Sequence, residues 1–247
     1  MKTYFLTDTG KVRTHNEDSV TILKNTNDEY LLAVADGMGG HKAGEVASSM
    51  AIDHLTEKFK EFSTLGTKAD AINWIRKEVD EINKSIFAYT AVHEESKGMG
   101  TTLVLAIYTK DYLLFGNVGD SSGFVLKAEK LYKVTKPHTL VNLLVESGKL
   151  TQEEAENHPR KNILMRALGA NNPAEVDIFD VDPDIDGIIL SSDGLTSMLS
   201  NDQIEKVLLN KNITLEEKVI KLIRKSNIRG GTDNISVACL FTEEGAV

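Results

Sequence analysis

Acidic residues at the ends of apolar runs are the feature that most constrains how this chain folds. The apolar run Tyr30–Ala35 leads directly into Asp36, and a glycine-rich stretch follows. Similar acids flank strand-length apolar runs at Asp18, Asp120, Asp193 and Asp233. A single acid of this kind is usually a simple turn residue. Five in one chain predict one carboxylate cluster at the end of a sheet, where a rigid scaffold holds side chains that solvent can reach.

Hydrophobic periodicity predicts ten strands and four helices. The strands are expected at 2–8, 18–24, 30–36, 101–108, 112–118, 123–127, 131–134, 175–181, 187–192 and 234–241. The helices are expected at about 42–62, 68–90, 201–209 and 215–226. Because short turns join the central strands, we expect an α+β fold of packed antiparallel sheets with helices on their outer faces.

The segment from about 136 to 173 interrupts this pattern. It holds short helical pieces, and Thr151 and Glu154 form the capping box of one of them. In a capping box the side chain of each residue accepts the backbone N–H of the other. The segment is long for a connection between strands. Long surface excursions of this kind tend to be lids or recognition elements, so we expect one here.

Composition indicates one globular domain that spans residues 1–247. With only four prolines and no Gly/Ser-rich run, the chain offers no linker. A formal net charge of −9 disfavours nucleic acid or an anionic membrane as a partner. The apolar runs are far shorter than the roughly 20 residues of a membrane helix, and Asp8 comes too early for a signal peptide. The single cysteine lies in a predicted core strand, so no intramolecular disulfide is expected. We expect a cytoplasmic protein, and a monomer by default.

The acids predict the chemistry of the site. Asp and Glu oxygens suit hard cations such as Mg²⁺, Mn²⁺ and Ca²⁺, whereas no Cys/His spacing for zinc is present. A carboxylate that bridges two such ions allows them to activate water for displacement at phosphorus. The chain has no G-x-x-x-x-G-K-[ST] loop, kinase signature set or G-x-S-x-G elbow. The sequence therefore predicts metal-assisted hydrolysis of a phosphate ester.

Six short motifs in order make the prediction more specific. They are Arg13-x-x-Asn-Glu-Asp18, Asp36-Gly-Met-Gly-Gly-His41, Gly100-Thr-Thr102, Gly119-Asp-Ser121, Ser192-Asp-Gly194 and Asp233-Asn234. Together they resemble the motifs of the metal-dependent protein phosphatase family, the protein phosphatase 2C type, in its compact bacterial form. The resemblance runs from about residue 5 to residue 241, and six motifs in register leave little room for chance.

The resemblance implies a set of metal ligands. Asp36 is expected to bridge two metals, and the carbonyl of Gly37 to bind one of them. Asp193 and Asp233 are expected to complete the second site, and Asp120 resembles the acid that holds a third metal together with Asp193. The implied cofactors are Mn²⁺ or Mg²⁺, as two or three ions.

The resemblance also implies roles for residues around the metals. Glu17 and Asp18 are expected to hold water molecules that surround the ions, and Arg13 to grip the substrate phosphate with its planar fork. His41 is either a proton donor to the leaving oxygen or a turn residue, and both interpretations stand. In animal relatives a histidine follows the ligand glycine directly, whereas here that place is Met38. The general acid is therefore unassigned.

The family's fold and substrates follow from the same resemblance. The implied fold is a central sandwich of two antiparallel β-sheets flanked by helices on both sides, with 136–173 as a flap beside the active site. The implied substrates are phosphoserine and phosphothreonine proteins, and a cognate serine/threonine kinase is a further expected partner. Two positions depart from the family pattern: Ser122 stands where arginine is usual, and Pro137 where an acid usually precedes the histidine.

Two other functions are compatible with these residues. A catalytically silent relative that binds a kinase or phosphoprotein would be expected to have lost ligands, yet every expected acid is present. A two-metal hydrolase of small phosphate esters or nucleotides would keep the acids. Activity on phosphopeptides compared with small esters separates it from a protein phosphatase.

Overall fold

Two antiparallel sheets form the centre of the computed structural model, which describes residues 1–39 and 43–242. The first sheet contains, in spatial order, β1 (Lys2–Asp8), β11 (Ile235–Phe241), β10 (Gly187–Ser191), β7 (Ser122–Lys127) and β8 (Lys130–Lys133). The second contains β2 (Asp18–Lys24), β3 (Tyr30–Met38), β5 (Leu103–Tyr108), β6 (Leu113–Val118) and β9 (Asp177–Val181), with β4 (Gly100–Thr101) paired to the end of β3.

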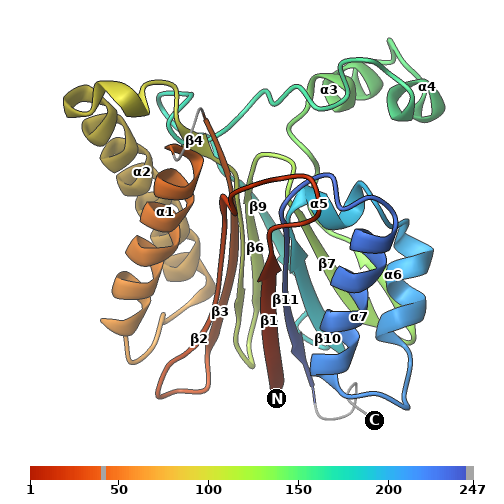
Figure 1. Ribbon diagram of the computed structural model, residues 1–247. Coiled ribbons are helices and arrows are strands. Elements are labelled where there is room, and N and C mark those ends of the chain that lie inside the picture. Colours follow the sequence, from red (N-terminus) through yellow and green to blue (C-terminus); the bar gives the residue numbers. More distant parts are fainter. Residues whose placement is uncertain (40–42, 243–247) are drawn as a thin grey trace.

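Helices cover the outer face of each sheet (Figure 1). The helices α1 (Ala43–Lys60) and α2 (Lys68–Val92) pack on the second sheet, and the short helix η1 (Glu94–Ser96) follows them. The helices α5 (Asp193–Thr196), α6 (Asn201–Leu208) and α7 (Leu215–Ile228) pack on the first sheet. The expected α+β sandwich with helices on both sides is therefore confirmed.

Three apolar layers hold the sandwich together, and β3 shows how the sequence builds them. Leu31 and Ala33 belong to the layer under α1 and α2, whereas Leu32 and Val34 belong to the layer between the sheets. Because side chains alternate along a strand, a strand that is covered on both faces must be apolar at every position. Full burial of one such leucine contributes about 1.5–3 kcal/mol to stability.

The strand near Asp36 is longer than the sequence predicts. Gly37 and Met38 pair with Thr101 and Gly100, so β3 continues past Asp36, and the expected strand 101–108 is divided into β4 and β5. Paired residues of β3 therefore lie before and after Asp36, so Asp36 does not end the strand. The short helix α5, which starts at Asp193, was also not expected; with only four residues it is too short for a periodic pattern.

The segment 136–173 projects from the sandwich as a flap that carries α3 (Leu140–Glu146) and α4 (Gln152–Glu156) (Figure 1). Its two ends run side by side, because the N–H of Leu140 donates to the carbonyl of Ile163 and the N–H of Met165 to that of His138. The predicted capping box of Thr151 and Glu154 is present at the start of α4. Among the helices of the described residues, none has the length and apolarity needed to cross a membrane.

Candidate active site

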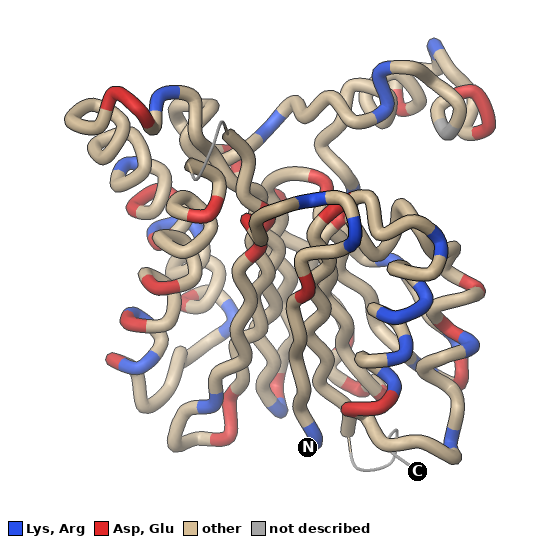
Figure 2. The backbone as a smooth tube through the Cα atoms, viewed as in Figure 1, with Lys and Arg blue, Asp and Glu red and all other residues tan. Residues whose placement is uncertain are grey.

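The expected acids meet at one end of the sandwich, and they come from both sheets. Asp18 and Asp36 lie opposite each other in the β2–β3 pair of the second sheet, and Asp120 follows β6 of that sheet. Asp193 follows β10 of the first sheet and Asp233 precedes β11. The expectation of a cluster at the end of one sheet is thus corrected, and Figure 2 shows acidic positions in the loops at this shared end.

A cavity of about 280 Å³ gathers most of the predicted site residues. Its lining includes Arg13, Glu17, Asp36, Gly37, Asp120, Asp193 and Asp233, together with Met38, Gly39, Thr102, Asn162 and Leu164. Asp18 is buried beside Asp36, and it does not line the cavity. His41 lies outside the described residues, so its predicted role stays a prediction.

Glycine at two positions lets the backbone of neighbouring elements approach the acids closely. A Cβ atom on Gly37 would lie 2.1 Å from the carbonyl oxygen of Gly44, at the start of α1. A Cβ atom on Gly194 would lie 2.0 Å from the carbonyl oxygen of Asn234. Any side chain would push these segments apart, and the acids beside them, Asp36 and Asp193, would move with them.

Asp18 has one satisfied and one unsatisfied carboxylate oxygen. The hydroxyl of Ser192 donates to its Oδ2 at 2.7 Å. Its Oδ1 is buried and has no hydrogen-bond partner among the residues that the structure describes. Because a buried carboxylate oxygen without a partner is costly, this atom fits a water molecule or a cation with its hydration shell.

The acids raise each other's pKa values. Burial, followed by Asp18 and Asp193, raises the pKa of Asp36 well above its usual value. Burial, followed by Asp120 and Asp233, raises the pKa of Asp193 to about 7, and burial raises the pKa of Asp18 to about 6. Buried carboxylates that repel one another in this way favour a multivalent cation. The cation offsets both the cost of burying their negative charge and their mutual repulsion.

The carboxylates line the cavity without forming a ready-made cage. Within the described part of the chain, no three His, Cys, Asp or Glu side chains form a compact group around one point. Mutual repulsion explains why the five acids that line one cavity stay spread around its wall. All of the donors are oxygens, as hard divalent cations require, so the residues present fit Mn²⁺ or Mg²⁺.

Arg13 lies beside the acids, with its side chain 47% exposed. Its Nη2 donates to Oδ2 of Asp233 at 2.8 Å, and Oδ1 of Asp233 accepts the N–H of Asn234 at 2.9 Å. The guanidinium is therefore held at the rim of the cavity, where a group with five N–H donors is able to meet an incoming anion.

Two residues that support the site were quoted in motifs without an assigned role. The side chain of Asn234 accepts the N–H of Glu17 at 2.8 Å and donates to the carbonyls of Thr9 and His15 at 2.9 Å each. It thereby anchors the loop that carries Arg13. Its position directly after Asp233 was the only sequence signal for this role.

Thr102 is the second such residue. Its Oγ1 accepts the N–H of Asp36 at 3.1 Å, and its N–H donates to the carbonyl of Asp36 at 2.8 Å. The same Oγ1 lies 2.8 Å from the hydroxyl of Ser121. Thr102 thus connects the backbone of Asp36 to the loop that carries Asp120.

Comparison with known proteins decides between the possible functions. The model of the protein phosphatase 2C family matches residues 10–225. The serine/threonine phosphatase stp of Listeria welshimeri is 44% identical over 238 residues, which cover 96% of this chain and 94% of that protein. The chain belongs to the protein phosphatase 2C family. It is a serine/threonine protein phosphatase, as the motifs predict, and the comparisons offer no support for a catalytically silent relative.

Solved structures agree with this assignment. The serine/threonine phosphatase of S. agalactiae has a TM-score of 0.92 and 36% identity, with coverage of 98% of this chain and 99% of that one. The catalytic domain of the phosphatase PstP, solved in complex with two manganese ions, has a TM-score of 0.81 and 33% identity, with 96% of each chain covered. The expected Mn²⁺ or Mg²⁺ cofactor is consistent with that complex.

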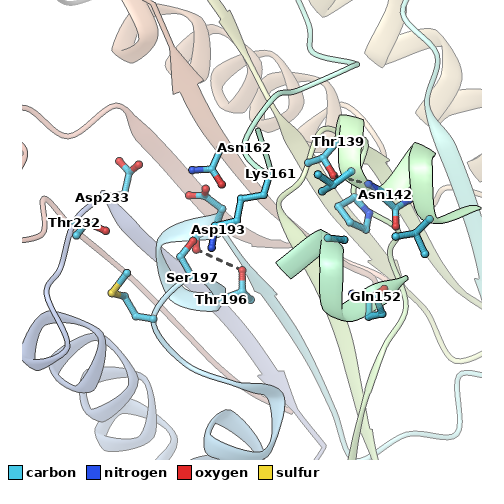
Figure 3. A pocket seen from close by; sticks show the side chains of 15 residues that line it. Thr139, Asn142, Gln152, Lys161, Asn162, Asp193, Thr196, Ser197, Thr232 and Asp233 are labelled. Carbon is cyan, nitrogen blue, oxygen red and sulfur yellow. Dashed lines mark hydrogen bonds between the residues drawn. The ribbon is translucent and has the colours of Figure 1, made fainter. Parts of the chain in front are cut away.

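A second, larger cavity of this phosphatase lies between the flap and α5 and adjoins the acids (Figure 3). It measures about 500 Å³, and Asp193 and Asp233 belong to its lining as well. Hydroxyl and amide side chains dominate the rest: Thr139, Asn142, Gln152, Asn162, Thr196, Ser197 and Thr232. In Figure 3, Asn162 lies close to Asp193, and Thr139, Asn142 and Gln152 belong to the flap side.

Proposed function

We propose that this phosphatase hydrolyses phosphoserine and phosphothreonine residues of proteins at the cavity that Asp36, Asp193, Asp233 and Arg13 line. The observation that carries the proposal is the meeting of these side chains from distant parts of the chain in one space. The acids supply oxygen donors for cations, and Arg13 supplies a fork for the phosphate. Carboxylates gathered beside one arginine are the groups that a metal-bound phosphate ester requires.

The proposed ligands are the residues that the motifs indicate. Two groups would hold the first ion: Asp36 and the carbonyl of Gly37. The second ion would be held by Asp36, Asp193 and Asp233. A third would be held by Asp120 and Asp193. Two or three Mn²⁺ or Mg²⁺ ions, when bound, supply the activation of water and the neutralisation of the phosphate charge. The raised pKa values of Asp36 and Asp193, which burial causes first and neighbouring acids second, support this set.

Glu17 and Asp18 act around the ions and do not bind them directly. We assign them the water molecules of the metal site, because Oδ1 of Asp18 is buried without a partner in the described residues and Glu17 lines the cavity. Ser192 orients Asp18 through its 2.7 Å hydrogen bond. Such oriented acids adjust the position and basicity of what the metal holds.

Arg13 binds the phosphoryl group of the substrate. Its present partner, Asp233, keeps the guanidinium at the rim, and part of the side chain is free to solvent. Charge-assisted hydrogen bonds from a planar fork are the strongest that a side chain makes to phosphate. The peptide on either side of the phosphorylated residue occupies the cavity of about 500 Å³ under the flap, where hydroxyl and amide groups meet a peptide backbone.

Several expectations stay predictions. One catalytic domain over residues 1–247 is supported by the apolar layer that both sheets share. The absence of a nucleic-acid partner is supported by the net charge of −9. A cognate serine/threonine kinase, the monomeric state, the absence of a membrane partner and the cytoplasmic location have no further support.

The test is phosphate release from a phosphothreonine peptide by wild-type protein with Mn²⁺, with chelator, and by Asp193→Asn. We expect turnover to require the metal and to fall by at least about a hundredfold in the variant, because one ligand of two ions is lost. Asp184→Asn is the matched control, since that side chain is 89% exposed. Wild-type protein that binds Mn²⁺ but releases phosphate only from small esters contradicts the proposed substrate class.

A further inference from the structure

The imidazole of His138 joins the flap to the backbone that carries Asp120. His138 lies at the start of the flap, where its side chain is only 9% exposed. Its Nδ1 lies 3.1 Å from the N–H of Gly119, and its own N–H donates to the carbonyl of Gly119 at 2.8 Å. Gly119 is therefore bound by two hydrogen bonds to one flap residue, and Asp120 is the next residue in the chain.

The partners of His138 determine where its ring proton lies. The N–H of Gly119 is only a donor, so Nδ1 must accept with its lone pair. The proton of the neutral ring is then on Nε2, which lies 3.1 Å from Oδ2 of Asp177 and donates to it. Nη1 of Arg166 lies 3.4 Å from the same Nε2, and it donates instead to the other oxygen of Asp177 at the shorter distance of 2.9 Å. Asp177 and Arg166 thus hold the ring in the tautomer that binds Gly119.

Burial disfavours the negative charge of Asp177, but the neighbours of Asp177 favour that charge more strongly. Burial acts to raise the pKa of Asp177, but the hydrogen bond from His138 and the charge of Arg166 outweigh it and lower the pKa. The Asp177 carboxylate therefore stays ionised and accepts the hydrogen bond from Nε2 of His138. Asp177 begins β9, a strand of the second sheet, so the ring is anchored to the sandwich as well as to Asp120's loop.

The surroundings of Gly119 leave it little freedom. Its φ is 111°, and a Cβ atom there would lie 2.6 Å from Cβ of Thr102, the residue that bonds the backbone of Asp36. Nδ2 of the buried Asn117 donates to the carbonyls of Gly119 and Lys136 at 3.1 and 2.9 Å. A shift of the flap's first residues is therefore expected to move Gly119, because hydrogen bonds and close packing connect the two segments.

His138 does not itself reach the acids. It lines neither the cavity of the carboxylates nor the larger cavity beneath the flap. It lines a separate cavity of about 270 Å³ together with Arg166 and Asp177. The hydrogen bonds to Gly119 are the connection from His138 to the loop that carries Asp120.

We propose that His138 is a positioning residue, which sets the placement of Asp120 by coupling the Gly119 backbone to the flap. The inference rests on the proposed role of Asp120 in the metal site. Flap and acid then form one unit: a flap that is correctly docked holds Asp120 in place, and a flap released from Gly119 leaves Asp120 free to move. The carbonyl of His138 extends the unit, because it accepts the N–H of Met165 from the returning end of the flap.

Two substitutions test the two hydrogen bonds of the His138 ring one at a time. His138→Asn places Oδ1 as many bonds from the backbone as Nδ1, so it keeps an acceptor for Gly119 and loses the bond to Asp177. His138→Gln places Nε2 at the reach of the ring's Nε2, so it keeps a donor for Asp177 and loses the acceptor for Gly119. Both variants retain the backbone bond between the two residues, and each is the control of the other.

The measurements are kcat/KM on a phosphothreonine peptide, hydrogen exchange of the Gly119 amide, and the ¹⁵N spectrum of the wild-type histidines. We expect His138→Asn to stay within about threefold of wild type and His138→Gln to lose about tenfold in kcat/KM, the consequence of one lost hydrogen bond. The Gly119 amide is expected to exchange faster only in His138→Gln. The spectrum is expected to show a protonated Nε2 and an unprotonated Nδ1 for His138.

Equal losses in both variants, in proportion to their loss of thermal stability, overturn the proposal, because a merely structural role does not distinguish the two bonds. A proton on Nδ1 of wild-type His138 overturns it even if neither variant folds. Failure of the proposed function is recognised separately: wild-type protein then releases no phosphate, while the spectrum and the Gly119 exchange still decide the role of His138.

Discussion

The hydroxyl of Ser192 donates a hydrogen bond of 2.7 Å to Oδ2 of Asp18, and both residues are buried. Ser192 follows β10 of the first sheet, whereas Asp18 begins β2 of the second. The same hydroxyl oxygen accepts the N–H of Ser236 in β11 at 2.9 Å. One side chain therefore joins three strands of two sheets beside the acids, and it orients the carboxylate that faces the proposed metal waters.

Ser192→Ala is expected to weaken both the fold and the metal site. It leaves the N–H of Ser236 and Oδ2 of Asp18 without this partner, at a cost of about 1–3 kcal/mol in the free energy of unfolding. Because the Ser192 bond acts to lower the pKa of Asp18 against the effect of burial, its loss also disfavours the ionised form. We expect weaker Mn²⁺ binding by calorimetry.

Ser85→Ala is the control for that change. Ser85 lies on the exposed side of α2, where its hydroxyl donates to the carbonyl of Glu81 at 2.9 Å. Its removal is expected to change stability by less than about 0.5 kcal/mol. Equal urea midpoints for the two serine variants would show that the bond between the sheets has no energetic role.

Protein stripped of metal by a chelator is expected to become more stable as the pH falls from about 8 to about 5. The pKa values of Asp193 and Asp18 are about 7 and about 6 in the folded chain, against about 3.9 in an unfolded chain. The folded state therefore binds more protons in this window, so stability falls as pH rises. The change is on the order of 4 kcal/mol for the two groups together, since each pH unit over which a group takes up its proton only in the folded state contributes about 1.4 kcal/mol.

Urea unfolding across this pH range measures the effect. Asp193→Asn is expected to give a flatter dependence, because a side chain that no longer titrates contributes nothing to the slope. Saturating Mn²⁺ is expected to reverse the slope of the wild-type protein, since the ion binds the ionised carboxylates. A stability that rises with pH without metal contradicts the repulsion inferred for the cavity.

Gly194→Ala is expected to disrupt the site much more than a glycine change elsewhere. The added Cβ atom meets the carbonyl oxygen of Asn234 at 2.0 Å, so α5 and β11 must separate. We expect a loss of several kcal/mol, on the order of 3, in stability and loss of phosphatase activity. Thermal unfolding and phosphate release measure the two effects.

Gly148→Ala is the matched control. Gly148 has a φ of 71°, but a Cβ atom there meets nothing within 4 Å. Its expected cost is backbone strain alone, about 1 kcal/mol. If both alanine variants lose the same stability, the close approach of α5 to β11 is not the reason for glycine at 194.

Arg13→Ala is expected to reduce kcat/KM on phosphopeptides by about 10- to 150-fold, which corresponds to the loss of a charge-assisted contact of about 1.5–3 kcal/mol. Arg13→Lys is expected to recover part of the loss, because the ammonium keeps the charge without the fork. The exposed Arg76 of α2 gives the control Arg76→Ala. Unchanged kinetics in Arg13→Ala would assign phosphate binding to another group.

Local patterns in the sequence were sufficient for much of the fold. The uninterrupted apolar run along 30–35 and the capping residues of α4 each act over a few positions, so the sequence alone indicates them. The acids were found for a related reason: each follows or precedes its own apolar run. Their order along the chain was enough to indicate the family.

Residues that support the site could not be predicted in this way. Asn234 holds the N–H of Glu17 across 217 positions of sequence, and Thr102 holds Asp36 across 66. The sequence indicated His138 only as the histidine that follows Pro137, and it gave the ring no role. A hydrogen bond between distant residues depends on where two sheets and a flap come to lie, which no local pattern encodes.

The sequence by itself determined most of the elements, the set of acids and their affinity for hard cations, because these follow from side-chain chemistry and short-range periodicity. Only the tertiary structure decided that the acids come from both sheets, that Ser192 reaches Asp18 between them, and that Asp193 shares one cavity with Arg13. The reason is physical: burial and mutual proximity change the pKa and the partners of a carboxylate, and both arise only when the chain is folded.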